Sequence, residues 1–221
     1  MIKVHPKIIV LNPPTYKEAI QKTIIAARNC YKSFDNSNED SDIKLIQHLI
    51  DLGHSSIMEQ AGFQYFDRSN NGVHLEDVRQ RTGKSHAVES TRWARYSGKK
   101  FGHQITVIDT MFFRENPRAY SIWEDAMLSA EKAYMALMDL GVPAEQAREV
   151  LPKSLKTDDV QYANFTGLRT FFNQRCGKQV HPEMRRKTLP FLDWCAKEYP
   201  VFFGDIRKKF QIEYDRFETL S

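Results

Sequence analysis

The sequence has little cysteine, and the few cysteines are not spaced as in a disulfide framework or a zinc site. They are Cys30, Cys176 and Cys195, and no C-x-x-C pair occurs among the 221 residues. Disulfide-dependent secreted domains and structural zinc sites need more cysteines at closer spacing. We therefore expect a cytoplasmic protein without a bound metal.

Long hydrophobic runs are also missing. The first residues, MIKVHPKIIVLNPPTYKEA, contain no extended apolar segment, so we expect no signal peptide. No stretch reaches the roughly 20 apolar residues that a membrane-spanning helix needs. The net charge of +4 comes without a long basic tract, which fits a small anionic ligand better than a polyanion. We expect neither a membrane nor a nucleic-acid partner.

A complete phosphate-binding P-loop is absent, although its last residues are present. Gly83-Lys84-Ser85 matches the end of the G-x-x-x-x-G-K-[ST] pattern, but position 78, where the first glycine belongs, is a valine. Both glycines are needed to wrap backbone N–H groups around a phosphate. We exclude a P-loop on this spacing.

The chain has enough apolar and aromatic residues to form a core. Hydrophobic residues make up 41% of it, with 14 Phe and 9 Tyr, a composition typical of a folded chain rather than a disordered one. No repeat, linker or low-complexity segment interrupts it. We predict a single domain spanning 1–221, of class α+β, with a small antiparallel or mixed sheet flanked by helices.

Local patterns place the elements of this fold. Thr15 and Glu18 form a capping box at the start of a helix, and Gly53 is placed to end the next one. Asn71-Gly72 predicts a tight turn between two strands. Strands are expected within 7–14 and 101–109, and helices within 15–31, 42–52, 117–140, 164–175 and 182–200, with a short one after Pro143.

A basic segment runs from Arg79 to Lys100. It contains seven Lys or Arg and one acid, Glu89, interleaved with hydroxyl and aromatic side chains. Guanidinium groups bind phosphate in bidentate fashion, so the segment predicts an anion site. A solvated basic face is the alternative on composition alone, and a module that grips RNA or single-stranded DNA is another.

The order of several motifs resembles that of the flavin-dependent thymidylate synthases, the ThyX family. Arg79-Gln80-Arg81, an eight-residue spacer, Ser90 and Arg92-Trp93 are similar to the family's R-H-R…S…R-Y signature. Further blocks in the family's order, from about residue 26 to 185, are AARNCY, GHSSIMEQ, AREVLP, NFTGLRTFFNQR and HPEMR. Several loosely matched blocks in register are more specific than any one of them.

The resemblance implies a ThyX-like fold and an enzyme, a methyltransferase. The implied reaction is reductive methylation of dUMP to dTMP. Methylene-tetrahydrofolate is the carbon donor, and FAD is the cofactor, reduced by NADPH. The resemblance also implies a homotetramer. Other thymidylate synthases use a cysteine that follows a proline, and no Pro-Cys occurs here, so we expect no thiol nucleophile.

The same resemblance assigns the site residues. Arg175 is the expected catalytic group, because a guanidinium keeps its proton and can stabilise a uracil anion. The residues expected to bind dUMP are Glu76, Arg79, Ser90, Arg92, Arg148 and Arg175. Those expected to bind FAD are Cys30, His54, Ser56, Glu59, Arg79, Gln80, Arg81, Asn164, Thr166 and Thr170.

This chain departs from the family's pattern at several of these positions. Gln80 stands where the family usually has His, and Trp93 where it usually has Tyr. Thr166 and Thr170 occupy positions where some relatives carry Arg and Asn. A catalytically impaired relative therefore remains an alternative.

The longer spacer leaves a further position open. Either Val88 or Glu89 replaces an acid that relatives place near dUMP. A valine side chain cannot accept a hydrogen bond, so the two alignments predict different contacts there.

Overall fold

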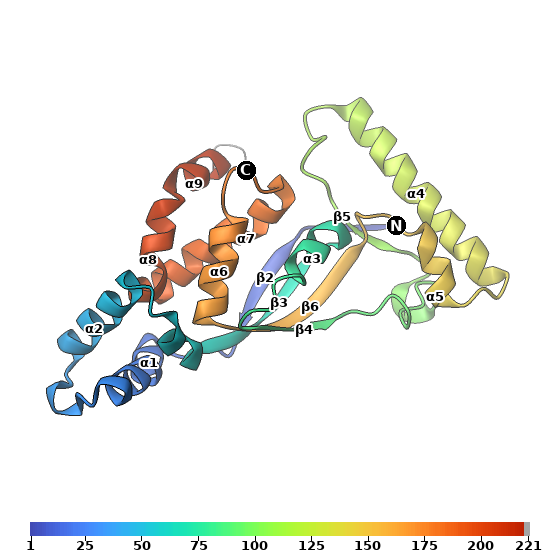
Figure 1. Cartoon of the computed structure of the whole chain (residues 1–221). Coiled ribbons are helices and arrows are strands. Elements are labelled where there is room, and N and C mark those ends of the chain that lie inside the picture. The colour runs from blue at the N-terminus through green and yellow to red at the C-terminus, as the bar shows by residue number, and fades with distance from the viewer. Residues whose placement is uncertain (219–221) are drawn as a thin grey trace. The chain divides into compact units, whose positions relative to one another are not determined.

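The computed structural model describes residues 1–218 and confirms the α+β class (Figure 1). The strands are β1 (Ile2–Val4), β2 (Lys7–Leu11), β3 (Gly62–Asn70), β4 (Lys84–Val88), β5 (Thr106–Ile108) and β6 (Lys156–Asn164). The helices are α1 (Tyr16–Tyr31), α2 (Glu39–Asp51), α3 (Asn71–Asp77), α4 (Pro117–Asp139), α5 (Ala144–Ala147), α6 (Phe165–Arg175), α7 (Pro182–Glu198), α8 (Pro200–Lys209) and α9 (Gln211–Glu218). Short 3₁₀ helices are η1 (Phe34–Asn36), η2 (Ser55–Gln60), η3 (Lys99–Phe101) and η4 (Arg148–Val150).

The strands form two sheets. Four of them pair in the order β2-β3-β6-β4, so strands distant in sequence are neighbours. The other sheet is β1 paired in parallel with β5, with Ile2 opposite Thr106 and Val4 opposite Ile108. Within residues 1–218, no helix is both long enough and apolar enough to cross a bilayer.

The chain divides into two compact units, which are described separately below. Unit 1 comprises Met1–Lys7, Asp67–Arg79 and Ala87–Val160. Unit 2 comprises Ile8–Phe66, Gln80–His86 and the chain from Gln161 onward. The single domain expected from the sequence stays a prediction.

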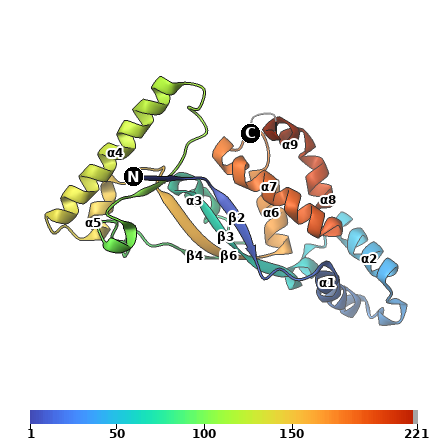
Figure 2. The same ribbon diagram turned by 180° about the vertical axis from the view of Figure 1, so that it is seen from behind.

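Unit 1 has a hydrophobic core to which helices α4 and α5 both contribute. Its buried members are Ala94, Tyr96, Ile105, Val107, Met127, Tyr134, Ala147 and Leu155. The helices α4 and α5 lie side by side in both views (Figures 1 and 2). Helix α4 begins as its sequence suggests: Asn116 accepts a hydrogen bond from the Ala119 amide at 3.1 Å, and Pro117 follows it.

Unit 2 has an aromatic core. The buried aromatic residues are Phe63, Tyr65, Phe165, Phe171, Phe172, Phe191, Tyr199, Phe202, Phe203 and Phe210. Helix α6 packs against η2, α7 and α8. It buries Phe165, Leu168 and Phe172 at helical spacing, which turns the other face of the helix outward.

Helix α1 begins and ends as the sequence predicts and is tied to α2 by a buried ion pair. Thr15 and Glu18 form the predicted capping box, with the Glu18 amide 3.2 Å from Thr15 Oγ1. Arg28 Nε lies 2.8 Å from Asp42 Oδ1, and the arginine is 3% exposed. The arginine of the AARNCY block is therefore a structural group, because removing it would leave the buried Asp42 carboxylate without its cationic partner.

The predicted hairpin at Asn71-Gly72 is wrong. Strand β3 continues to Asn70, and helix α3 starts at the next residue. The Asn70 side chain accepts a hydrogen bond from the Val73 amide at 2.8 Å and so caps the helix. A side-chain cap competes with a tight turn at the same residues, and here the buried Val73 and His74 favour the helix.

Candidate functional site

Two predicted anion-binding arginines are brought together in unit 1. Arg148 Nη1 donates to Thr91 Oγ1 at 3.3 Å, and Arg92 Nη2 donates to Glu145 Oε2 at 3.1 Å. The segments that carry them are about fifty residues apart in sequence. Since Ser90 directly precedes Thr91, three residues predicted from the sequence share one surface of unit 1.

The unit 1 core positions these two segments. Ala94, which ends a turn closed by the hydrogen bond from its amide to Ser90 O at 2.9 Å, is buried in that core. Ala147, the residue before Arg148, is buried in the same core. The two arginines therefore project from short segments whose ends are anchored by packing, which reduces the entropy lost when they bind an anion.

Glu145 is a residue of this cluster that the sequence reasoning missed. Its side chain is 51% exposed and that of Arg92 is 60% exposed, so their ion pair faces solvent. An exposed pair contributes at most about 1 kcal/mol, so a doubly charged phosphate can replace the carboxylate. The available signal was its place three residues before Arg148, on the same short helical segment.

A fixed charge network lies on β6 and the start of the Ser90 turn. Lys156 Nζ is 2.5 Å from Glu89 Oε2 and 2.9 Å from Asp158 Oδ2, and Arg68 Nε is 2.8 Å from Asp158 Oδ1. Burial raises the pKa of Asp158, but the hydrogen bonds from Arg68 and Lys156 outweigh it and hold that pKa below its ordinary value. Glu89 is thus a member of the network, whereas Val88 is exposed.

The remaining predicted residues of unit 1 lie at the end of α3. Glu76 is half-buried on the last turn of this helix, and Arg79 is exposed two residues after the helix ends. Arg79 immediately precedes Gln80, the first residue of the unit 2 segment Gln80–His86.

In unit 2 the Gly83-Lys84-Ser85 tripeptide has a structural explanation. Gly83 has φ +63° and its carbonyl accepts from the Asn164 amide at 2.8 Å. A Cβ on Gly83 would lie 2.2 Å from Asn164 Oδ1, and one on Gly167 would lie 2.8 Å from Gly83 O. These close approaches require glycine, because the turn lies directly on the start of α6.

Lys84 is likewise engaged within unit 2. It is 7% exposed, and its Nζ lies 4.1 Å from the centroid of the Phe171 ring, a cation–π contact. The lysine that would meet a phosphate in a P-loop is buried here, in agreement with the exclusion made from the sequence.

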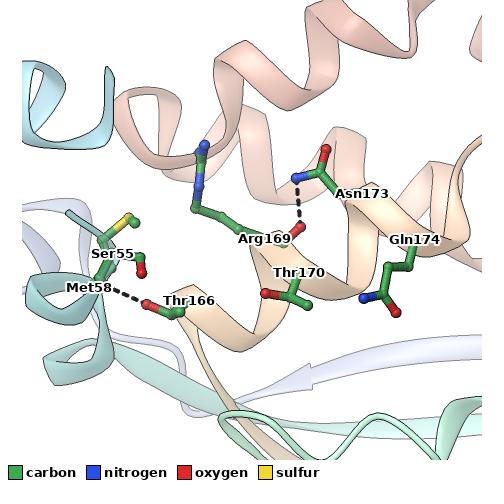
Figure 3. Close-up of a pocket in the computed structure, with 7 residues that line it drawn as sticks. All are labelled: Ser55, Met58, Thr166, Arg169, Thr170, Asn173 and Gln174. Carbon is green, nitrogen blue, oxygen red and sulfur yellow. Dashed lines mark hydrogen bonds between the residues drawn. The ribbon is translucent and has the colours of Figure 1, made fainter. Parts of the chain in front are cut away.

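The outward face of α6 and the segment η2 line a pocket of about 310 Å³. Figure 3 shows its residues, which are Ser55, Met58, Thr166, Arg169, Thr170, Asn173 and Gln174. Thr166 Oγ1 donates to the Ser55 carbonyl at 2.6 Å and ties the helix to η2. Two of the predicted cofactor residues, Thr166 and Thr170, therefore line a real cavity.

Other predicted cofactor residues lie on the segments beside that pocket. His54, Ser56 and Glu59 are exposed on or next to η2. The residues of η2 that line the pocket are instead Ser55 and Met58. The oxygen of the Asn164 side chain accepts from the Gly167 amide at 2.8 Å, so it caps α6.

Cys30 is exposed, and the neighbouring Tyr31 Oη lies 3.3 Å from His54 Nδ1. The other two cysteines, Cys176 and Cys195, are buried.

Gln80 contacts Gln174 across the unit. Gln80 Nε2 donates a hydrogen bond to Gln174 Oε1, while Gln80 Oε1 is buried with no partner among the described residues. Arg81, the next residue of the triplet, is exposed, and the half-buried Arg175 follows Gln174 at the end of α6. Sequence reasoning missed Gln174, since a surface glutamine on a helix gives no signal by itself.

The chain is similar to known proteins over most of its length. Residues 14–201 match the family model described as thymidylate synthase complementing protein. The chain belongs to this family. The family membership confirms the resemblance seen in the motifs.

Individual relatives agree with this family. A flavin-dependent thymidylate synthase from Geobacter sulfurreducens is 31% identical over 188 residues, covering 82% of this chain and 79% of that protein. One from Pyrococcus abyssi is 24% identical, covering 75% of this chain and 67% of that protein. A solved structure of the UMP/dUMP methylase PolB from Streptomyces cacaoi, bound with 5-Br dUMP, has the same fold, with a TM-score of 0.77 and 19% sequence identity. The match covers 95% of this chain and 98% of the methylase chain.

Proposed function

We propose that the protein is a flavin-dependent thymidylate synthase that methylates dUMP to dTMP. Methylene-tetrahydrofolate is the carbon donor, and NADPH reduces the bound FAD. The observation that carries the proposal is the meeting of the Ser90 turn with the Arg148 segment, in a chain that belongs to this family. Two independent motifs of the family thereby form one cationic surface.

The cationic surface suits the phosphate of dUMP. Arg92 and Arg148 offer guanidinium donors, and Ser90 adds a neutral hydroxyl. A nucleotide phosphate carries more negative charge than the Glu145 carboxylate that now contacts Arg92, so it competes well for that arginine. The solved methylase of the same fold carries a dUMP analogue, which supports a nucleotide ligand for this chain.

Arg175 is proposed to act on the uracil ring. It is half-buried at the C-terminal end of α6, and its guanidinium stays charged at any physiological pH. A fixed positive charge beside the ring favours loss of the N3 proton and stabilises the anion that makes carbon 5 a better nucleophile. Catalysis then needs no enzyme thiol.

The residues of unit 2 fit a flavin. The pocket between α6 and η2 is lined mainly by hydroxyl and amide groups, and the buried acceptor on Gln80 needs a donor that a flavin can supply. A flavin bound there would supply the redox and methylene-transfer chemistry of the reaction. The residues of unit 2 proposed to hold it are Cys30, His54, Ser56, Glu59, Gln80, Arg81, Asn164, Thr166 and Thr170. Arg79, which belongs to unit 1 and directly precedes Gln80 in the chain, is proposed as a further ligand.

The proposal includes a homotetramer that works in the cytoplasm. Several large apolar side chains face solvent in the single chain, among them Ile25 on α1, Ile122 on α4 and Leu140 after α4. Apolar side chains on helix surfaces favour association with further copies.

A reconstituted assay tests the function. The purified full chain should turn yellow with FAD and should form dTMP when dUMP, methylene-tetrahydrofolate and NADPH are all present, and not when any one is omitted. A yellow protein that forms no dTMP would instead be an impaired relative. A colourless protein that binds oligonucleotides would be a nucleic-acid module. Growth of a thymidine-requiring bacterial strain carrying the gene is the matching test in cells.

A further inference from the structure

A pair of glutamine amides sits at the edge of the pocket on α6. Gln174 lines the pocket, and its Oε1 accepts the hydrogen bond from Gln80 Nε2. Figure 3 shows the Gln174 amide with its nitrogen turned toward Thr170. The pairing uses one donor of Gln80 and one lone pair of Gln174, so both N–H groups of Gln174 remain to serve a ligand.

The Gln80 amide also has an unused hydrogen-bond acceptor. Its Oε1 is buried and accepts no hydrogen bond from any described residue. A buried acceptor without a donor costs free energy, and such a group in a native protein calls for a partner. Together the two amides offer one acceptor, Gln80 Oε1, and the N–H donors of Gln174. A ligand that carries an N–H group next to a carbonyl or a ring nitrogen can bind both at once.

The pocket beside this pair carries little free charge. Its one cation, Arg169, is held by Asp205, with Nη1–Oδ1 and Nη2–Oδ2 distances of 2.8 and 2.6 Å, and it also donates to the Phe202 carbonyl. The other lining groups are hydroxyls, amides and the thioether of Met58. A neutral polar lining suits an uncharged heterocycle better than a phosphate.

We propose that Gln174 is a positioning residue of the flavin site: it fixes Gln80, and the two amides together bind an uncharged N–H-bearing edge of the flavin cofactor. This inference rests on the proposed function, because it takes FAD as the ligand. The edge is either the imide of the isoalloxazine ring, which has an N–H between two carbonyls, or the amino edge of the adenine.

The pairing explains how Gln80 can stand in the triplet of this chain. An isolated glutamine side chain has three rotatable bonds and loses that freedom on binding a ligand. The hydrogen bond that Gln80 donates to Gln174 restricts it before FAD arrives, so less entropy is lost in the complex. Since neither amide titrates, this contact does not change between pH 6 and 8, unlike one made by a histidine.

A double-mutant cycle on FAD binding tests the proposal. The dissociation constant for FAD is measured by quenching of flavin fluorescence for the full chain and for Gln80→Met, Gln174→Met and the double variant. Each single change should weaken FAD binding about five- to ten-fold, and the double change should weaken it no more than the worse single one. Gln21→Met, an exposed glutamine on α1, is the matched control and should leave binding unchanged.

Two further readouts separate positioning from a merely structural role. The thermal unfolding midpoint without FAD should stay within about 2 °C in Gln174→Met, because the side chain is exposed. FMN, which lacks the adenine, identifies the edge: equal weakening of FMN and FAD assigns the isoalloxazine imide, and weakening of FAD alone assigns the adenine. Either result supports the amide pair.

The outcomes that overturn the inference are distinct from failure of the proposed function. If the full chain binds FAD but Gln174→Met binds it equally well, or if the two single changes simply add, the amide pair has no role. If Gln174→Met weakens dUMP and leaves FAD unchanged, the pair serves the nucleotide and the assignment is wrong. If the unaltered chain does not bind FAD at all, the proposed function itself fails.

Discussion

The guanidinium of Arg148 donates a hydrogen bond to the hydroxyl of Thr91 at 3.3 Å, across 57 residues of sequence. This contact joins the AREVLP block to the segment that carries Ser90 and Arg92, two motifs that are far apart along the chain. Arg92 and Arg148, which are distant in sequence, thereby lie on one surface that carries both guanidinium groups.

Arg148→Met should raise the KM for dUMP about ten-fold or more. A charge-assisted hydrogen bond to phosphate contributes about 1.5–3 kcal/mol, and each 1.4 kcal/mol changes affinity ten-fold. Steady-state kinetics with varied dUMP measures this. Arg118→Met, an exposed arginine in the first turn of α4, is the control and should behave like the unaltered protein. An unchanged KM in Arg148→Met would remove the residue from the substrate site.

Arg175→Ala should keep the fold and lose turnover. The Thr188 hydroxyl bonds the carbonyl of Arg175 at 3.0 Å, so that contact does not depend on the side chain. Removing one preorganised charge-stabilising group costs about 3 kcal/mol, or roughly a hundred-fold in kcat. Circular dichroism and dTMP formation are the two measurements. Turnover within three-fold of the unaltered enzyme would exclude Arg175 from the mechanism.

Replacing all three cysteines by alanine should leave methylation measurable. Cys176 is fully buried, and burial raises its pKa to about 12, so it is not a thiolate at neutral pH. Burial also raises the pKa of Cys195. The triple variant should lose some stability, since two of the alanines replace buried side chains. If dTMP formation stops while FAD still binds, a thiol nucleophile takes part after all.

Gly83→Ala should destabilise the protein much more than Gly53→Ala. Both glycines have positive φ, which costs an alanine about 1–2 kcal/mol. Only Gly83 also has a neighbour in the way: its new Cβ would lie 2.2 Å from the Asn164 oxygen that caps α6, whereas Gly53 has open space. We expect about 3 kcal/mol or more for Gly83→Ala, and about 1–2 kcal/mol for Gly53→Ala. Urea unfolding of both variants checks this, and equal losses would contradict the account.

Local features of the fold were predictable from the sequence. Thr15 with Glu18, and Gly53, use hydrogen bonds and backbone freedom that depend only on nearby residues, and each lies where the pattern placed it. Asn70 shows the limit of such reasoning. Its side chain decides between a turn and a helix, and the Asn-Gly pair alone does not reveal that choice.

Strand β6 could not be found from its hydrophobic pattern. Its inward positions are polar: Thr157, Asp159 and Gln161 are all buried. Their partners come from distant strands, since Tyr65 Oη donates to Gln161 Oε1 at 2.6 Å and the Ala87 amide donates to Asp159 at 2.9 Å. A strand whose buried face is polar is stabilised by partners that only the folded sheet supplies.

The residues of the candidate site fall into two groups, those assigned from sequence motifs and those found only in the structure. Ser90, Arg92 and Arg148 were assigned from one sequence because their motifs resemble those of the family, and their roles as ligands of dUMP stay predictions. Glu145 and Gln174 were missed, since each takes part through one hydrogen bond to a residue far away in the chain, and only Glu145 had a signal in the sequence, its place near Arg148.

The most direct test of the central claim is a titration of the FAD-loaded protein with dUMP, followed by the flavin absorption spectrum. The claim is that this chain binds both a uracil nucleotide and a flavin, and that Arg148 helps to hold the nucleotide. It predicts a saturable change in the flavin band that Arg148→Met shifts to at least about ten-fold higher dUMP. A flavin band that does not respond to saturating dUMP, or that responds equally in Arg148→Met, would contradict it.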